Sequence, residues 1–130
     1  MKYPKPFLRL IKQSAKKSFQ LLRLHGPYSC EALGEEVFVT KLFFDHIAHN
    51  RLRKRPVHDL VERLLIIPLI SEVISYGVLT EDRIVKTKLY RKIAWARGLD
   101  TFVAIVVKDK DDWYLLSCFI EKKTQKNNPS

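Results

Sequence analysis

Seven polar side chains in this sequence are of the types that can cleave RNA without a metal ion. They are two histidines three residues apart, a cluster of bases around a tyrosine, and one hydroxyl in an apolar stretch: His46, His49, Lys86, Lys88, Tyr90, Arg91 and Ser117. Histidine suits proton transfer because its pKa lies near neutrality, and lysine and arginine bind phosphate oxygens. In such a reaction a base takes the 2′-hydroxyl proton, the oxygen attacks the adjacent phosphorus, and an acid protonates the departing 5′-oxygen. The residue types fit this chemistry if the fold brings them together.

Each of these residues also has an ordinary structural explanation. Helical histidines are commonly exposed or capping side chains, and strand hydroxyls such as Ser117 commonly bond to nearby backbone groups. His46 and His49 have the spacing of two metal ligands on a helix, but no third ligand lies at a convincing spacing, so we expect no metal and no cofactor. The sequence contains no glycine-rich phosphate loop, HExxH pair or GxSxG motif.

Positive charge dominates the chain and is segregated along it. The net charge is +10, from 24 basic and 14 acidic side chains. Residues 1–30 hold seven Lys or Arg and no acid, residues 83–97 hold six bases and no acid, and residues 51–55 read RLRKR. A field of this kind attracts polyanions. We expect RNA contacts from the later two blocks, at Arg51, Arg53, Lys54, Arg55, Lys88, Tyr90 and Lys92. An acidic protein partner or an anionic membrane surface would also fit the charge.

Length and composition predict one globular domain over residues 1–130. Within it, residues 1–25 form a basic amphipathic helix, residues 36–121 a core and residues 122–130 a flexible polar tail. No apolar run reaches the roughly 18 residues that a membrane span needs, and the start lacks a signal-peptide pattern. The two distant cysteines, Cys30 and Cys118, predict no disulfide and a reducing compartment.

The elements that must position the polar residues are organised around residues 102–121. Two apolar runs there flank the polar segment KDKDD and predict a hairpin near the middle of a sheet. Upstream, periodicity and breakers predict helices over residues 6–24, 41–51 and 56–76, with a break near Pro68 and an end at Gly77. Residues 36–40 are predicted as a strand, 83–96 as a strand or bent strand pair, 27–34 as a loop and 78–82 as a turn. The order predicts an α+β fold, with N-terminal helices on one face of a four- to five-stranded antiparallel sheet and the other face open.

Residues 36–121 resemble the barnase–EndoU–colicin–RelE-like (BECR) ribonuclease superfamily, in particular its phage-associated and contact-dependent-inhibition toxin branches. The resemblance lies in the succession VFVTKLFFDHIAHNR, RLLIIPLISEVISYG, IVKTKLYRKI and GLDTFVAIVVKDKDDWYLLSCF. It implies metal-independent cleavage of RNA, often tRNA, on the open face of the sheet. Carried over, His46 is the first choice as acid or base and His49 the second. Lys86, Lys88 or Arg91 would bind the phosphate, and Ser117 would match a Ser or Thr on a late strand.

The expected function is therefore an endoribonuclease toxin that acts in the cytoplasm, free-standing or delivered as part of a larger toxin. Its expected partners are RNA and an acidic immunity protein or antitoxin; the sequence does not separate monomer from dimer. The alternative is a non-enzymatic nucleic-acid-binding or toxin-associated interaction module. A functional role for Ser117 requires it to lie within a phosphate's reach of His46 or His49 and of one base from residues 83–97.

Overall fold

The computed structural model describes residues 3–48 and 57–122 of the chain. The elements follow in the order α1 (Lys5–His25), β1 (Tyr28–Cys30), β2 (Glu35–Phe38), α2 (Lys41–Ala48), α3 (Val57–Ile66), the 3₁₀ helix η1 (Ile67–Leu69), α4 (Ile70–Tyr76), β3 (Val78–Val85), β4 (Lys88–Arg97), β5 (Asp100–Asp109) and β6 (Asp112–Lys122). The predicted basic segment at residues 51–55 and most of the predicted tail lie outside the described residues.

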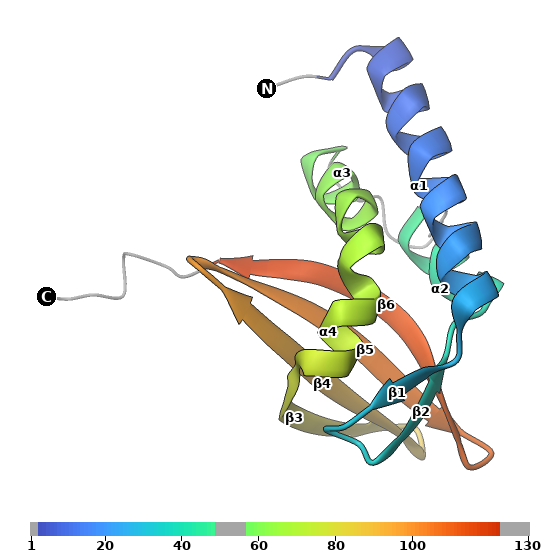
Figure 1. Ribbon diagram of the computed structural model, residues 1–130, viewed down its shortest axis with the longest axis vertical. Coiled ribbons are helices and arrows are strands. Elements are labelled where there is room, and N and C mark those ends of the chain that lie inside the picture. The colour runs from blue at the N-terminus through green and yellow to red at the C-terminus, as the bar shows by residue number, and fades with distance from the viewer. Residues whose placement is uncertain (1–2, 49–56, 123–130) are drawn as a thin grey trace, which may run out of the picture.

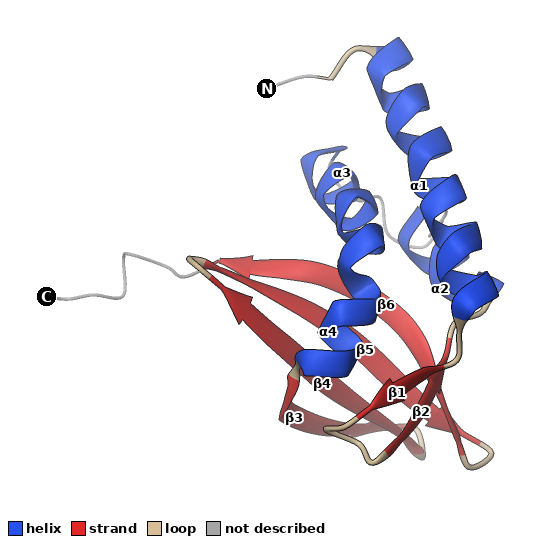
Figure 2. Cartoon of the chain, viewed as in Figure 1, coloured by secondary structure: helices blue, strands red, loops and turns tan. Residues whose placement is uncertain are grey.

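The fold is α+β, as predicted, with the helices packed on one side of a single sheet (Figures 1 and 2). The described strands form a six-stranded sheet in the order β1-β2-β6-β5-β4-β3. Neighbours are antiparallel except for β2 and β6, which run parallel through the pairs Val37–Trp113 and Phe38–Tyr114. The predicted four to five antiparallel strands thus correspond to six strands in a mixed sheet.

The additional strands were missed because both outer strands are weakly marked in the sequence. The predicted loop at residues 27–34 contains β1, which is only three residues long. The predicted turn at residues 78–82 belongs to β3, an edge strand whose eight residues are all exposed. An exposed edge strand need not show the apolar alternation by which strands are recognised.

The hairpin predicted for residues 102–121 is confirmed. β5 and β6 pair over their length and occupy the middle of the sheet, and β4 lies beside β5 as expected from its order. Lys110 and Asp111 form the β5–β6 turn, with φ of 52° and 75°. Two consecutive positive φ values are the geometry of the type I′ turn, whose twist matches that of the flanking strands.

The helices also break and end at the residues predicted to interrupt them. Helix α1 covers the predicted segment, Pro68 lies in the 3₁₀ turn between α3 and α4, and α4 ends before Gly77. A Cβ at Gly77 would lie 2.4 Å from the carbonyl oxygen of Val73 and 2.5 Å from Cγ2 of Ile93. Gly77 therefore allows the chain to pass from the helix layer to the sheet at close range.

One hydrophobic core lies between the helices and the sheet face that they cover. Helices α1 and α2 contribute Phe19 and Phe43, and β6 contributes Trp113, Leu115 and Cys118. Both cysteines are buried, and they do not form a disulfide. Within the described ranges, no helix combines the length and the apolar character needed to cross a membrane.

Candidate active site

A cleft of about 540 Å³ lies on the face of the sheet that points away from the core, and α2 and α3 reach its margin. Its lining comes from four neighbouring strands and from the sides of α2 and α3: His46, Arg63, Glu81, Arg83, Val85, Tyr90, Arg91, Lys92, Ile105, Leu116, Ser117 and Phe119. The register explains the row of strand residues. Ser117 pairs with Ile105, Ile105 pairs with Lys92, and Lys92 pairs with Glu81, so one side chain from each strand faces the cleft.

A β-bulge at Leu116 turns Ser117 toward this cleft. Leu115 pairs with Val106 and Ser117 pairs with the adjacent Ile105, so Leu116 is an extra residue in β6. Continuing the earlier register would instead pair Ser117 with Ala104, whose side chain belongs to the core under the helices. The bulge thus moves Ser117, the one serine of this apolar run, from the core face to the cleft face.

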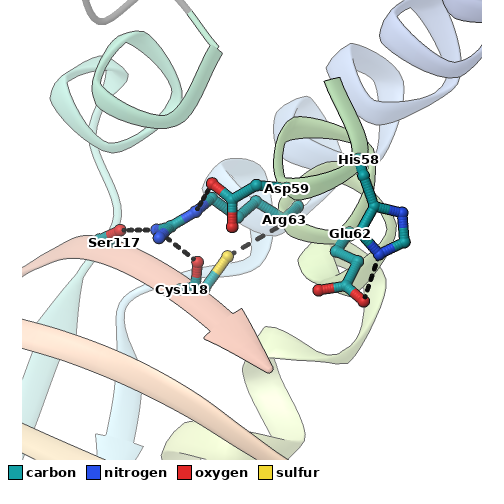
Figure 3. A network of polar contacts seen from close by, with 6 residues as sticks. All are labelled: His58, Asp59, Glu62, Arg63, Ser117 and Cys118. Atoms are coloured by element: carbon teal, nitrogen blue, oxygen red, sulfur yellow. Dashed lines mark hydrogen bonds and ion pairs between the residues drawn. The ribbon is translucent and has the colours of Figure 1, made fainter. Parts of the chain in front are cut away.

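The second half of β6 has a free edge that α3 approaches. Strand β2 pairs with β6 only at Trp113 and Tyr114, and no other described strand adjoins that side. From α3, Arg63 Nη1 donates to Ser117 Oγ at 2.9 Å and to the Cys118 carbonyl oxygen at 3.1 Å (Figure 3). The Cys118 thiol donates in return to the carbonyl oxygen of Arg63 at 3.5 Å. Helix and strand are therefore joined at the margin of the cleft.

One aromatic ring lies near two of the cations in the cleft. The Arg63 guanidinium carbon lies 5.4 Å from the centre of the Phe119 ring, and Lys92 Nζ lies 6.0 Å from it. Both distances are within the range of cation–π attraction. Phe119, two residues along β6 from Ser117, thereby helps to fix Arg63 and Lys92 in the cleft.

Each cation of the cleft lies next to a carboxylate. The pairs are Arg63–Asp59 (3.0 Å), Arg83–Glu81 (3.3 Å), Arg91–Asp82 (3.0 Å) and Lys92–Glu121. The Arg83 pair is the most open, with side-chain exposures of 70% and 47%. Exposed ion pairs contribute only about 0–1 kcal/mol, so an incoming polyanion can replace that carboxylate. The Arg63 side chain is only 15% exposed and is held more firmly.

Five of the residues predicted from sequence line the cleft together: His46, Tyr90, Arg91, Lys92 and Ser117. His46 extends from the last turn of α2, while the other four come from β4 and β6. Ser117, one histidine and bases from residues 83–97 therefore line one cleft, while the predicted distance between them stays a prediction. His49, Arg51, Arg53, Lys54 and Arg55 lie outside the described residues.

The other predicted cations differ in their placement. Lys86 lies in the β3–β4 turn and Lys88 at the exposed start of β4, and neither lines the cleft. The Arg91 guanidinium lies 5.2 Å from the ring centre of the buried Trp113, on the core side of the sheet. Arg91 thus reaches the cleft margin while its charge is directed to Trp113 and Asp82.

Three lining residues with ionisable side chains were not predicted: Arg63, Arg83 and Glu81. Asp59 and Arg63 are spaced i, i+4, which in a sequence is typical of an ion pair on a solvated helix face. Arg83 is the first residue of the acid-free block at residues 83–97, and the sequence did not distinguish it from the other bases of that block. Arg63 could have been found only by knowing that α3 passes along the free edge of β6.

The described ranges contain no group of three or more His, Cys, Asp or Glu side chains that could hold a metal ion. Comparison of the chain with family models, with curated proteins and with solved structures found no match. The function is therefore inferred from the chemistry of the cleft.

Proposed function

We propose that this protein is a metal-independent endoribonuclease toxin of the BECR type that cleaves RNA, with tRNA as its first candidate substrate. One observation carries the proposal: a single cleft on the open sheet face gathers a histidine, a hydroxyl, a tyrosine and several cations. These groups meet the needs of 2′-hydroxyl attack on the adjacent phosphate, which are proton transfer and stabilisation of charge on the phosphoryl oxygens.

The cleft residues divide by chemistry. His46 is the proton-transfer residue, because it is the lining side chain whose ordinary pKa is nearest neutrality. Lys92 and the exposed Arg83 bind backbone phosphates on either side of the reacting one. Tyr90 offers a ring on which an unpaired base stacks. RNA is the substrate class because only RNA supplies the attacking 2′-hydroxyl.

The alternative is a module that binds nucleic acid without cleaving it. Positive charge and an aromatic ring would suffice for that role. His46 in the same cleft as Ser117 favours the enzyme, since binding alone has no need of a proton-transfer group. An acidic immunity protein or antitoxin fits either function, because a basic cleft attracts an acidic surface.

The test is incubation of total tRNA with the protein in EDTA. We expect cleavage by the wild type, with products that end in a 2′,3′-cyclic phosphate. His46→Ala should lower the rate about 10²- to 10⁴-fold, the usual contribution of a general acid or base. His58→Ala is the matched control, because His58 is a histidine on α3 that does not line the cleft.

Thermal unfolding of both variants checks that the fold is intact. Folded wild-type protein that binds tRNA but leaves tRNA and total cellular RNA uncut would exclude the ribonuclease and support the binding module. An equal loss of cleavage rate in His46→Ala and His58→Ala would show that His46 does not transfer a proton in the reaction.

A further inference from the structure

The contact between α3 and β6 leaves unused hydrogen-bond donors at the cleft. Arginine has donors only, so in the Arg63–Ser117 contact the Ser117 oxygen is the acceptor. The hydroxyl hydrogen of Ser117 then has no acceptor among the described residues. Arg63 uses Nε toward Asp59 and Nη1 toward Ser117 and Cys118, and its Nη2 amino group makes no hydrogen bond within residues 3–48 and 57–122.

The two side chains that carry these unused donors are largely buried. Ser117 is 6% exposed and is the single buried polar residue in the described part of the chain, and the Arg63 side chain is 15% exposed. Arg63 Nη2 is not among the buried side-chain atoms that lack a partner within the described residues, so it is open to solvent or to a ligand. Both residues line the cleft, so a ligand placed there can accept from both. The acceptor that suits a guanidinium and a hydroxyl together is an oxyanion.

We propose that Arg63 and Ser117 form the binding site of the reacting phosphate, which we call the seat. This inference rests on the proposed function and assigns the reacting position within it. Arg63 Nη2 and the Ser117 hydroxyl donate to the non-bridging phosphoryl oxygens. Arg63 Nη1 also polarises the Ser117 O–H bond, which strengthens that hydroxyl as a donor. Ser117 acts as a donor here and forms no covalent intermediate.

Asp59 is the positioning residue of this seat. Its carboxylate accepts from Arg63 Nε, and the Cys118 carbonyl oxygen accepts from Nη1, so two of the three guanidinium nitrogens are held before a ligand arrives. A donor group fixed in advance costs no reorganisation during reaction. Lysine cannot reproduce this arrangement, because a single ammonium group cannot span the same acceptors.

The seat is tested first without catalysis, by titrating the full-length protein with inorganic phosphate and following amide chemical shifts. We expect shifts at Ser117 and its β6 neighbours in the wild type. Arg63→Lys and Ser117→Ala should each weaken phosphate binding about tenfold, as expected for one hydrogen bond to a charged group. Asp59→Ala should bind more weakly than the wild type and more tightly than Arg63→Lys. Glu62→Gln is the matched control, since Glu62 pairs with His58 on the same helix, outside the cleft.

Kinetics of tRNA cleavage supply the second measurement. Arg63→Lys should lower kcat about 10²- to 10³-fold and leave KM nearly unchanged, as for other oxyanion donors. In Arg63→Ala, guanidinium ion at millimolar concentration should restore part of the rate, which a purely structural role would not allow.

The outcomes separate the seat from the proposed function. Phosphate binding that depends on Arg63 and Ser117 in a protein that cuts no RNA would support the anion seat and overturn the ribonuclease. Efficient cleavage by Arg63→Lys and Ser117→Ala, at the level of Glu62→Gln, would overturn the seat and leave the ribonuclease in place. Phosphate binding by Asp59→Ala equal to that of the wild type would overturn the positioning role.

Discussion

At the scale of single residues, the sequence was sufficient to predict the identity of several residues that line the cleft. The type of residue and its place in an acid-free block were sufficient to select Tyr90, Arg91 and Lys92, and a lone hydroxyl in an apolar run selected Ser117. The direction of Ser117 was not predictable, because one extra residue in β6 reverses the face and a continuous apolar run has no alternation that would reveal it. Arg63 was missed because its i, i+4 partner made it resemble a solvated pair.

Cys30 gives a pH-dependent prediction at this scale. Cys30 is 1% exposed, and burial raises the pKa of its thiol. Above the ordinary pKa of a thiol, the unfolded chain loses this proton before the folded protein does. The free energy of unfolding should therefore fall as pH rises through that range, by at most about 1.4 kcal/mol per pH unit from this group. Below the ordinary pKa of a thiol the effect should be absent, because the folded and the unfolded protein both keep the proton.

Urea unfolding at a series of alkaline pH values measures this dependence. Cys30→Ala should flatten the fall, and Tyr28→Phe is the control. Burial also raises the pKa of the Tyr28 phenol, but from a higher ordinary value. An equally steep fall in Cys30→Ala and in the wild type would refute the assignment to Cys30.

At the scale of elements, helices and the central hairpin were predictable, and the edge strands were not. Helices such as α1 carry a long apolar stripe, and β5 and β6 combine two apolar runs with a polar turn. The β3–β4 hairpin has neither feature. Its strand β3 is fully exposed, and its turn residues, Lys86 and Thr87, lack the Asn or Gly that marks a type I′ turn.

The backbone of the β3–β4 turn is strained at one residue, and a substitution there can remove the strain. Thr87 has a φ of 71°, which is unfavourable for a β-branched side chain. Thr87→Gly should raise the free energy of unfolding by about 1 kcal/mol, because glycine adopts this conformation without a steric penalty. Asp111→Gly in the β5–β6 turn should gain less, since aspartate tolerates the left-handed region better. Urea unfolding of the two variants gives the comparison; a larger gain at Asp111 would contradict this account.

At the scale of the whole molecule, the α+β class and the open sheet face follow from helices that precede strands in the chain. The strand order was not predictable. Strands β2 and β6 meet through only two residue pairs, Val37–Trp113 and Phe38–Tyr114, from distant parts of the sequence. No local pattern encodes so short a parallel contact, which is specified by the packing of α2 and α3 against β6.

The net charge of +10 leads to a prediction about binding. Affinity of His46→Ala for tRNA should fall linearly on a plot of log K against log salt concentration, through counterion release. Removing one of the proposed phosphate contacts in the cleft, by Arg83→Ala or Lys92→Ala, should reduce the slope by about 0.7 to 0.9. Lys12→Ala and Lys16→Ala, on exposed positions of α1, are the controls and should leave the slope nearly unchanged. A larger change in the α1 variants would locate the RNA on α1 instead.

The position of β6 also has a consequence for the order in which this protein is assembled during synthesis. Strand β6 lies between β2 and β5, yet it follows every other described strand in the chain. Until residues 112–122 have left the ribosome, β1 and β2 have no connection through hydrogen bonds to β3, β4 and β5. Ser117 and the backbone acceptor for Arg63 arrive on the same strand that closes the sheet. A nascent chain without β6 therefore has no assembled cleft, and the cleft forms only when the sheet is complete.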